Sequence, residues 1–157
     1  MTDYDILIPS SNNLMFEFNR NKEFFEGLLK KKIDIVKPTM KQMNFKLRYK
    51  LPKKYAVFFI GASHDYKKWN IEKFVKAANY INSQYNFDIV LCSTSEDYKQ
   101  ASALEKNYNG KLINLVGKTS LIELITIINN GELLLSNETL APHIAVALDL
   151  SLIHISE

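Results

Sequence analysis

Short apolar runs alternate along most of this chain with longer segments in which apolar residues recur at helical spacing. The runs at residues 55–60, 87–92, 111–115 and 132–135 predict buried strands. Helical spacing is found over 71–83, from 96 to about 106, over 121–129, and from Pro142 onward. Strand and helix therefore alternate, which predicts an α/β fold with a parallel, Rossmann-like sheet and right-handed crossovers.

Three of the predicted strands run directly into polar or small-residue turns that lead to helices. These turns begin after residues 60, 92 and 135. In an open parallel sheet, ligands bind beyond the carboxyl ends of the strands, so we predict that the three turns share one ligand site. The glycine-rich fingerprint of dinucleotide-binding domains is absent because Gly61 stands alone, which disfavours a nicotinamide-dependent dehydrogenase.

The turn after residue 135 has the features of an anion site. Thr139 is placed to cap the following helix and Pro142 suits its first turn, so backbone N–H groups and the positive end of the helix dipole would face a ligand. His143 would add a donor to the same oxygens. A diphosphate fits such a site. A single histidine near a helix start is more often a surface or capping residue, so a purely structural turn remains the alternative.

The other two turns contribute small residues and charges. Gly61 and Ser63 allow close approach of the backbone to a ligand, and Lys67 offers a mobile cation for phosphate. For Trp69, at a helix entrance, packing is the stronger interpretation. Glu96 begins a helix, where the helix dipole alone favours an acid.

Taken together, these motifs resemble the carboxyl-terminal domain of the family 9 glycosyltransferases, the ADP-heptose:lipopolysaccharide heptosyltransferases. The motifs are GAS with KKW at 61–69, GKTSLIEL at 117–124, and SNET with HIA at 136–145. Their order and spacing match over about 55–148. The resemblance implies the GT-B architecture, in which two Rossmann-like domains face each other across a cleft and the carboxyl-terminal one holds the nucleotide-sugar donor.

Seven residues match the family's donor-site positions, and the resemblance implies that no metal is needed. They are Ser63 and Lys67 near the phosphates, Glu96 on the ribose, Thr119 beside the base, and Glu138, Thr139 and His143 around the diphosphate and the transferred sugar. Two positions depart from the family pattern. Glu138 replaces the usual aspartate, and Leu140 replaces a small residue, so it is expected to narrow the approach to phosphate.

The family's catalytic aspartate lies early in the amino-terminal domain, so the resemblance implies no catalytic residue in this chain. We interpret residues 1–29 as the tail end of that domain, 30–54 as the interdomain linker and 55–149 as the donor-binding domain. The domain pair is therefore expected to be incomplete at both ends. Such a fragment would bind a donor without transferring sugar, because the base and the acceptor site are missing.

The last eight residues, 150–157, match the translation of a transposase adapter used in sequencing libraries. We therefore predict a non-native tail in which His154 has no function. The alternative is a genuine strand, since Leu152, Ile153 and Ile155 are apolar enough for the next position in the sheet. The nucleotide sequence decides between the two.

Composition narrows the partners further. With 157 residues and 46% hydrophobic content, the chain can bury the core of one domain, whereas a GT-B enzyme has two. The net charge of +3 is too small to indicate binding to nucleic acid. The basic runs at 30–32 and 50–54 are typical of solvated linkers, although in a lipopolysaccharide enzyme they would face an anionic inner-membrane leaflet.

The location follows from what the sequence lacks. No apolar stretch approaches the roughly 20 residues that span a bilayer, and no signal peptide is visible, so we expect a cytoplasmic protein, with peripheral contact at the inner membrane. The single cysteine, Cys92, lies in a predicted strand and is expected to be a core residue.

Three functions remain open at this point. The favoured one is the donor-binding part of an inverting, heptosyltransferase-like enzyme, with an ADP-heptose-like donor and a lipopolysaccharide core or other glycan as acceptor. The second is a stand-alone module that binds a nucleotide or sugar phosphate. The third is a GT-B transferase that uses a UDP- or GDP-sugar.

Overall fold

The computed structural model describes residues 17–36, 39–40 and 45–154. Its contacts divide the chain into two units, one ending at Lys37 and the other beginning at Pro38. In the first unit, the helix α1 spans Glu17–Leu29. The start of the predicted amino-terminal remnant, residues 1–16, lies outside the described residues.

The second unit is built on a five-stranded sheet with the order β3-β2-β1-β4-β5, in which every neighbouring pair of strands is parallel. The α/β fold and the parallel, Rossmann-like sheet predicted from the sequence are thereby confirmed. The strands are β1 (Tyr55–Phe59), β2 (Asp88–Cys92), β3 (Leu112–Asn114), β4 (Leu133–Ser136) and β5 (Leu152–His154).

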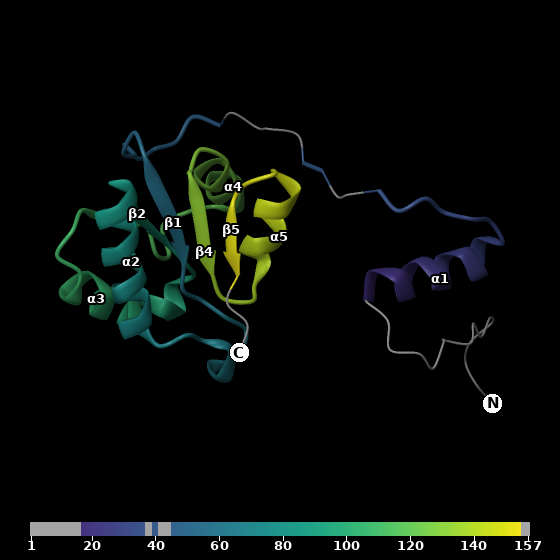
Figure 1. Ribbon diagram of the computed structural model, residues 1–157, viewed down its shortest axis with the longest axis horizontal. Coiled ribbons are helices and arrows are strands. Elements are labelled where there is room, and N and C mark those ends of the chain that lie inside the picture. The colour runs from purple at the N-terminus through teal and green to yellow at the C-terminus, as the bar shows by residue number, and fades with distance from the viewer. Residues whose placement is uncertain (1–16, 37–38, 41–44, 155–157) are drawn as a thin grey trace. The chain divides into compact units, whose positions relative to one another are not determined.

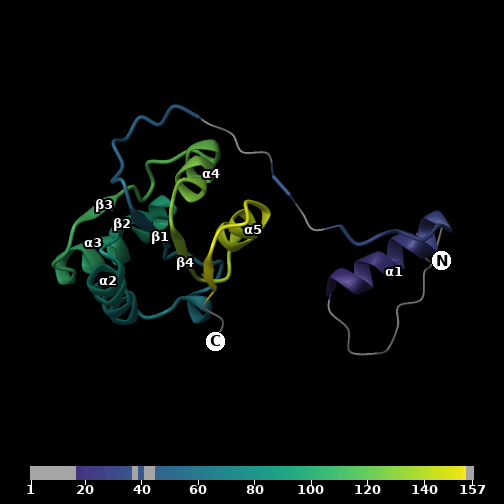
Figure 2. The same cartoon turned by 45° about the horizontal axis from the view of Figure 1, so that its top comes forward.

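Helices cover both faces of this sheet, as Figure 1 and the turned view in Figure 2 show. One face carries α2 (Ile71–Tyr85) and α3 (Tyr98–Asn107), and the other carries α4 (Leu121–Asn129) and α5 (Leu140–Ala147). Two short 3₁₀ turns, η1 (Asp65–Lys67) and η2 (Ser95–Asp97), precede α2 and α3. Among the described residues, no helix is long and apolar enough to cross a membrane.

The strands are buried on both faces, which explains why they appear in the sequence as continuous apolar runs. Val57 and Val90 belong to the core beneath α4 and α5, whereas Phe58 and Leu91 belong to the core beneath α2 and α3. Cys92 is buried in the first of these cores, and burial raises the pKa of its thiol to about 12. The prediction of Cys92 as a core residue is therefore confirmed.

Residues 45–54 contain neither helix nor strand, as expected of a linker, yet they are attached to the sheet unit. Leu47, Tyr49 and Leu51 pack against the core beneath α4 and α5. Just upstream, the Met40 amide donates to the Ala147 carbonyl at 2.9 Å. This part of the chain is therefore packed against the sheet unit and belongs to it structurally.

The strand β5 pairs with β4 in parallel, with Leu152 opposite Leu134. The backbone thus adopts the strand that the sequence offers as the alternative to a non-native tail. Residues 155–157 lie outside the described residues. The adapter origin of 150–157 concerns the gene rather than the fold, and it stays a prediction.

Candidate functional site

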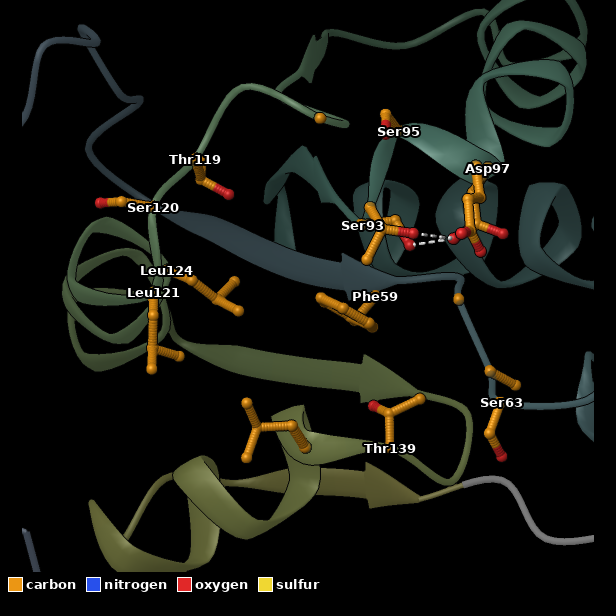
Figure 3. A pocket seen from close by; sticks show the side chains of 16 residues that line it. Phe59, Ser63, Ser93, Ser95, Asp97, Thr119, Ser120, Leu121, Leu124 and Thr139 are labelled. Carbon is orange, nitrogen blue, oxygen red and sulfur yellow. Dashed lines mark hydrogen bonds between the residues drawn. The ribbon is translucent and has the colours of Figure 1, made fainter.

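A cavity of about 570 Å³ opens beyond the carboxyl ends of the central strands. Figure 3 shows side chains reaching it from the segments after β1, β2, β3 and β4. The three turns singled out in the sequence thus meet at one cavity. Parallel strands present their carboxyl ends along one edge, which is why segments far apart in the chain converge there.

Four of the seven predicted site residues line this cavity. Ser63 follows β1, Glu96 lies in η2, Thr119 lies in the loop before α4, and Thr139 caps α5. In Figure 3, Thr119 and Thr139 approach the cavity from opposite sides, and the Thr119 side chain is directed inward. The hydroxyl and carboxylate groups needed to bind a polar ligand are therefore gathered in one place.

The remaining three residues lie beside the cavity rather than in it. Glu138 and His143 line a smaller hollow of about 240 Å³, and Thr139 belongs to both spaces. Lys67 lines neither of these two spaces, but its Nζ lies 3.0 Å from Oε2 of Glu138. This contact with Glu138 raises the pKa of Lys67, so the lysine is charged and engaged with the carboxylate.

The start of α5 offers fewer backbone donors than the sequence predicts. Thr139 caps the helix as expected, but its Oγ1 accepts from the Ala141 amide at 3.3 Å. Pro142 in the same turn has no N–H group. Of the first three amides, at most that of Leu140 is left for an anion. An anion at the start of α5 would therefore depend more on side chains, and less on backbone amides, than the motif predicts.

Asp97 is a cavity residue that sequence reasoning missed. It is buried, its Oδ2 accepts from Ser93 Oγ at 2.5 Å, and its Oδ1 lies 3.2 Å from Lys68 Nζ. A Cβ on Gly61 would lie 2.5 Å from Ser93 Oγ and 2.7 Å from Asp97 Oδ2. The glycine therefore makes room for this buried pair, and it also lines the cavity.

Asn137 was missed as well, although it lies within the SNET motif. It is fully buried, its Nδ2 donates to the Ile60 carbonyl at 2.7 Å, and its Oδ1 accepts from the Trp69 amide at 3.1 Å. The side chain thus joins the end of β4 to the segment after β1. Trp69 itself packs edge-on against Phe74, which confirms the packing interpretation.

The two ends of the cavity differ in polarity. In Figure 3, the apolar Leu121 and Leu124, from the start of α4, lie at one end together with Thr119 and Ser120, whereas Ser63, Ser93 and Asp97 lie at the other. An elongated ligand with an apolar ring at one end and polar groups at the other matches this distribution. Within the part of the chain that the structure describes, no group of three or more potential metal ligands occurs.

Comparison with known protein families decides the assignment. The profile of glycosyltransferase family 9 (heptosyltransferase) matches residues 10–155, almost the whole chain. The chain belongs to glycosyltransferase family 9. The resemblance carried by the motifs at 55–148 is thereby confirmed, and the match extends beyond them on both sides. A comparison with curated proteins gave no match.

Solved structures of family 9 share the fold. A glycosyl transferase of family 9 from Veillonella parvula superposes with a TM-score of 0.60 at 17% identity, covering 90% of this chain and 35% of that one. The ADP-heptose lipopolysaccharide heptosyltransferase II of E. coli superposes with a TM-score of 0.58 at 19% identity, covering 65% of this chain and 32% of that one. For E. coli heptosyltransferase WaaC with ADP, the TM-score is 0.57 at 22% identity, covering 64% of this chain and 33% of that one. The chain thus spans about a third of the length of these relatives.

Proposed function

We propose that this chain is the donor-binding part of an inverting family 9 glycosyltransferase, and that its donor is an ADP-sugar of the heptose type. One observation carries the proposal. The cavity at the carboxyl edge of the sheet gathers Ser63, Glu96, Thr119 and Thr139 from four separate segments. Its volume of about 570 Å³ lies within the range of sites that bind small ligands.

The two ends of the cavity suggest how the nucleotide lies. The base lies at the apolar end, against Leu121 and Leu124, with Thr119 at its edge. The ribose hydroxyls donate to the Glu96 carboxylate. The diphosphate then extends toward Ser63 and Thr139, at the polar end. This order follows the family roles of these residues and the chemistry that lines the cavity.

The charges beside the cavity are proposed to act on the leaving group. Sugar transfer leaves negative charge on the nucleoside diphosphate, and preorganised positive groups lower the free energy of that transition state. Lys67 and His143 are the candidates for this task. Glu138, which holds Lys67 at 3.0 Å, is proposed to contact the transferred sugar.

Three further parts of the proposal concern the whole protein. The base and the acceptor site, for a lipopolysaccharide core or another glycan, are proposed to lie outside this chain, so the chain alone binds donor without transferring sugar. Donor binding is proposed to need no metal, so that a chelator leaves it unchanged. The protein is proposed to act in the cytoplasm, with its lysine-rich segments against the anionic inner membrane.

Calorimetric titration of the chain with ADP, UDP and GDP tests the proposal. We expect saturable binding of ADP, weaker binding of the other two, and the same affinity with a chelator present. Glu96→Gln should weaken ADP binding, whereas Glu72→Gln, an exposed carboxylate on α2, should not. A preference for UDP or GDP would overturn the ADP-sugar assignment, and no binding of any nucleotide would overturn the donor site.

A further inference from the structure

A bidentate ion pair links the segment before β1 to the helix that borders the cavity. Nε of Arg48 donates to Oε1 of Glu123 at 2.7 Å, and its Nη2 donates to Oε2 at 2.9 Å. The side chain of Arg48 is 68% exposed, whereas that of Glu123 is 2% exposed. The carboxylate is therefore held at a fixed place in the fold, and the arginine reaches it from outside.

The same carboxylate also fixes one end of the loop 117–120. The amide and the hydroxyl of Ser120 both donate to Oε2 of Glu123 at 2.9 Å, and Ser120 Oγ accepts from the Glu123 amide. This reciprocal capping box starts α4. Hydrogen bonds from Arg48 and Ser120 lower the pKa of Glu123 to about 2, so the acceptor is ionised at neutral pH.

The other end of the loop is held by the same external segment. The Lys118 carbonyl accepts from the hydroxyl of Tyr49 and, at 3.4 Å, from Nη2 of Arg48. Thr119 thus lies between Lys118 and Ser120, both held by hydrogen bonds, and its side chain lines the cavity. At residue 117 the backbone is left-handed, with a φ of 66°, a conformation that glycine adopts without strain.

We propose that Arg48 is a positioning residue for the cavity, holding Thr119 toward the bound nucleotide through Glu123 and the Lys118 carbonyl. The identity of the ligand as a nucleotide rests on the proposed function, whereas the hydrogen bonds that hold the loop are seen in the structure. Arg48 lies outside the cavity, so it acts through the loop and does not touch the ligand. Movement of the segment 45–54 would therefore shift Thr119 in the cavity through the contacts of Arg48 with Glu123 and with the Lys118 carbonyl.

Hydrogen exchange tests the fastening without any ligand. In Arg48→Ala, the amides of 117–121 should exchange several-fold faster than in the unaltered chain, because the Ser120 amide loses the support of its acceptor. Lys111→Ala is the matched control, since it removes an ion pair of 3.0 Å with Asp88 at the opposite end of the strands. Unchanged exchange at 117–121 in Arg48→Ala would overturn the inference.

Nucleotide affinity tests the consequence. Arg48→Ala should weaken ADP binding by about three- to tenfold, the scale of one misplaced hydrogen bond. Arg48→Lys should recover only part of the loss, because lysine lacks the planar fork that makes both contacts. Tyr49→Phe, which removes the second contact to the Lys118 carbonyl, should act in the same direction with a smaller effect, and it keeps the test available should Arg48→Ala not fold.

The outcomes separate the two claims. Absence of ADP binding by the unaltered chain overturns the proposed function. Normal ADP binding by Arg48→Ala and Tyr49→Phe, even with a lowered melting temperature, overturns the positioning role, because a residue that only stabilises the fold changes melting without changing the affinity of the folded chain.

Discussion

Two sets of polar residues surround the cavity, and they differ in burial. In the first set, Asp97 and Glu123 are buried carboxylates that hold their neighbours through several hydrogen bonds, and the buried Asn137 joins the end of β4 to the segment after β1. In the second set, Glu138 and His143 are exposed, and Lys67 is held by Glu138 across a partly exposed ion pair. We call the first set the fixed side and the second set the exposed side, according to their burial.

This difference in burial suggests different roles, with the buried groups setting the shape of the site and the exposed groups its charge. Exposed ion pairs contribute little free energy, so Lys67 can exchange Glu138 for a phosphate at small cost. Removing a partner from a buried group that makes several hydrogen bonds costs more free energy of folding. We therefore expect the fixed side to set the shape of the nucleoside site, and the exposed side to adjust its charges around a diphosphate and a sugar.

The largest effect should come from the fixed side, as a loss of stability. Asn137→Ala removes two hydrogen bonds made by a fully buried side chain and leaves the Ile60 carbonyl without that donor. We expect the free energy of unfolding to fall by about 2–4 kcal/mol. Chemical denaturation measures it. Asn107→Ala, whose exposed side chain bonds only to its own helix, should change stability by less than about 0.5 kcal/mol.

On the exposed side, the corresponding change should affect binding rather than folding. Lys67→Ala removes the cation proposed to meet the diphosphate, so ADP affinity should fall about tenfold with little change in stability. Titration calorimetry and thermal melting measure the two quantities. Lys76→Ala, an exposed lysine on α2, serves as the control. A large loss of stability with unchanged affinity in Lys67→Ala would reverse the comparison.

Low pH should lower the free energy of unfolding through protonation of Glu123, a residue of the fixed side. Its pKa is lowered from 4.5 to about 2 in the fold, so the ionised form stabilises the native state. That contribution is complete above pH 4.5 and is lost as the pH falls toward about 2. The difference in unfolding free energy between the unaltered chain and Glu123→Gln should therefore shrink over this interval. A difference that stays constant would contradict the role given to the carboxylate.

The smallest effect is expected at Leu140, on the rim of the cavity. Its side chain is 54% exposed, and the resemblance described above implies a small residue at this position in the family. Leu140→Ala should open the approach to the first amide of α5 and improve ADP affinity by about two- to threefold. Competition titration against ADP measures so small a change. Weaker binding by Leu140→Ala would show that the leucine contacts the nucleotide instead of obstructing it.

The sequence predicted the order of elements because hydrophobic periodicity is a local property. Strand and helix limits agree within two residues, and the convergence of three turns followed from parallel pairing alone. The roles of Asp97 and Asn137 were not predicted, because each depends on a backbone or side chain brought close by the fold.

The ion pair of Arg48 and Glu123 shows the same limit. Its members are 75 residues apart, and no local pattern connects them. From the sequence alone, Glu123 belongs to a family motif and residues 30–54 are interpreted as a linker, so neither interpretation predicts their contact. Thr139 was predicted to cap α5, but only the geometry shows that this cap occupies the Ala141 amide, which is then not free to bind an anion.

The most direct test of the account is where ADP binds. The cavity contains Leu121, Leu124 and Leu140, whereas a separate apolar hollow of about 420 Å³ is lined by Leu133 and Ile153. In a chain with isotopically labelled leucine and isoleucine methyl groups, NMR spectra recorded during an ADP titration distinguish the two. We predict saturable shifts at the three cavity leucines and none at Leu133 or Ile153. Shifts confined to Leu133 and Ile153, or to no methyl group, would contradict the assignment of the donor site.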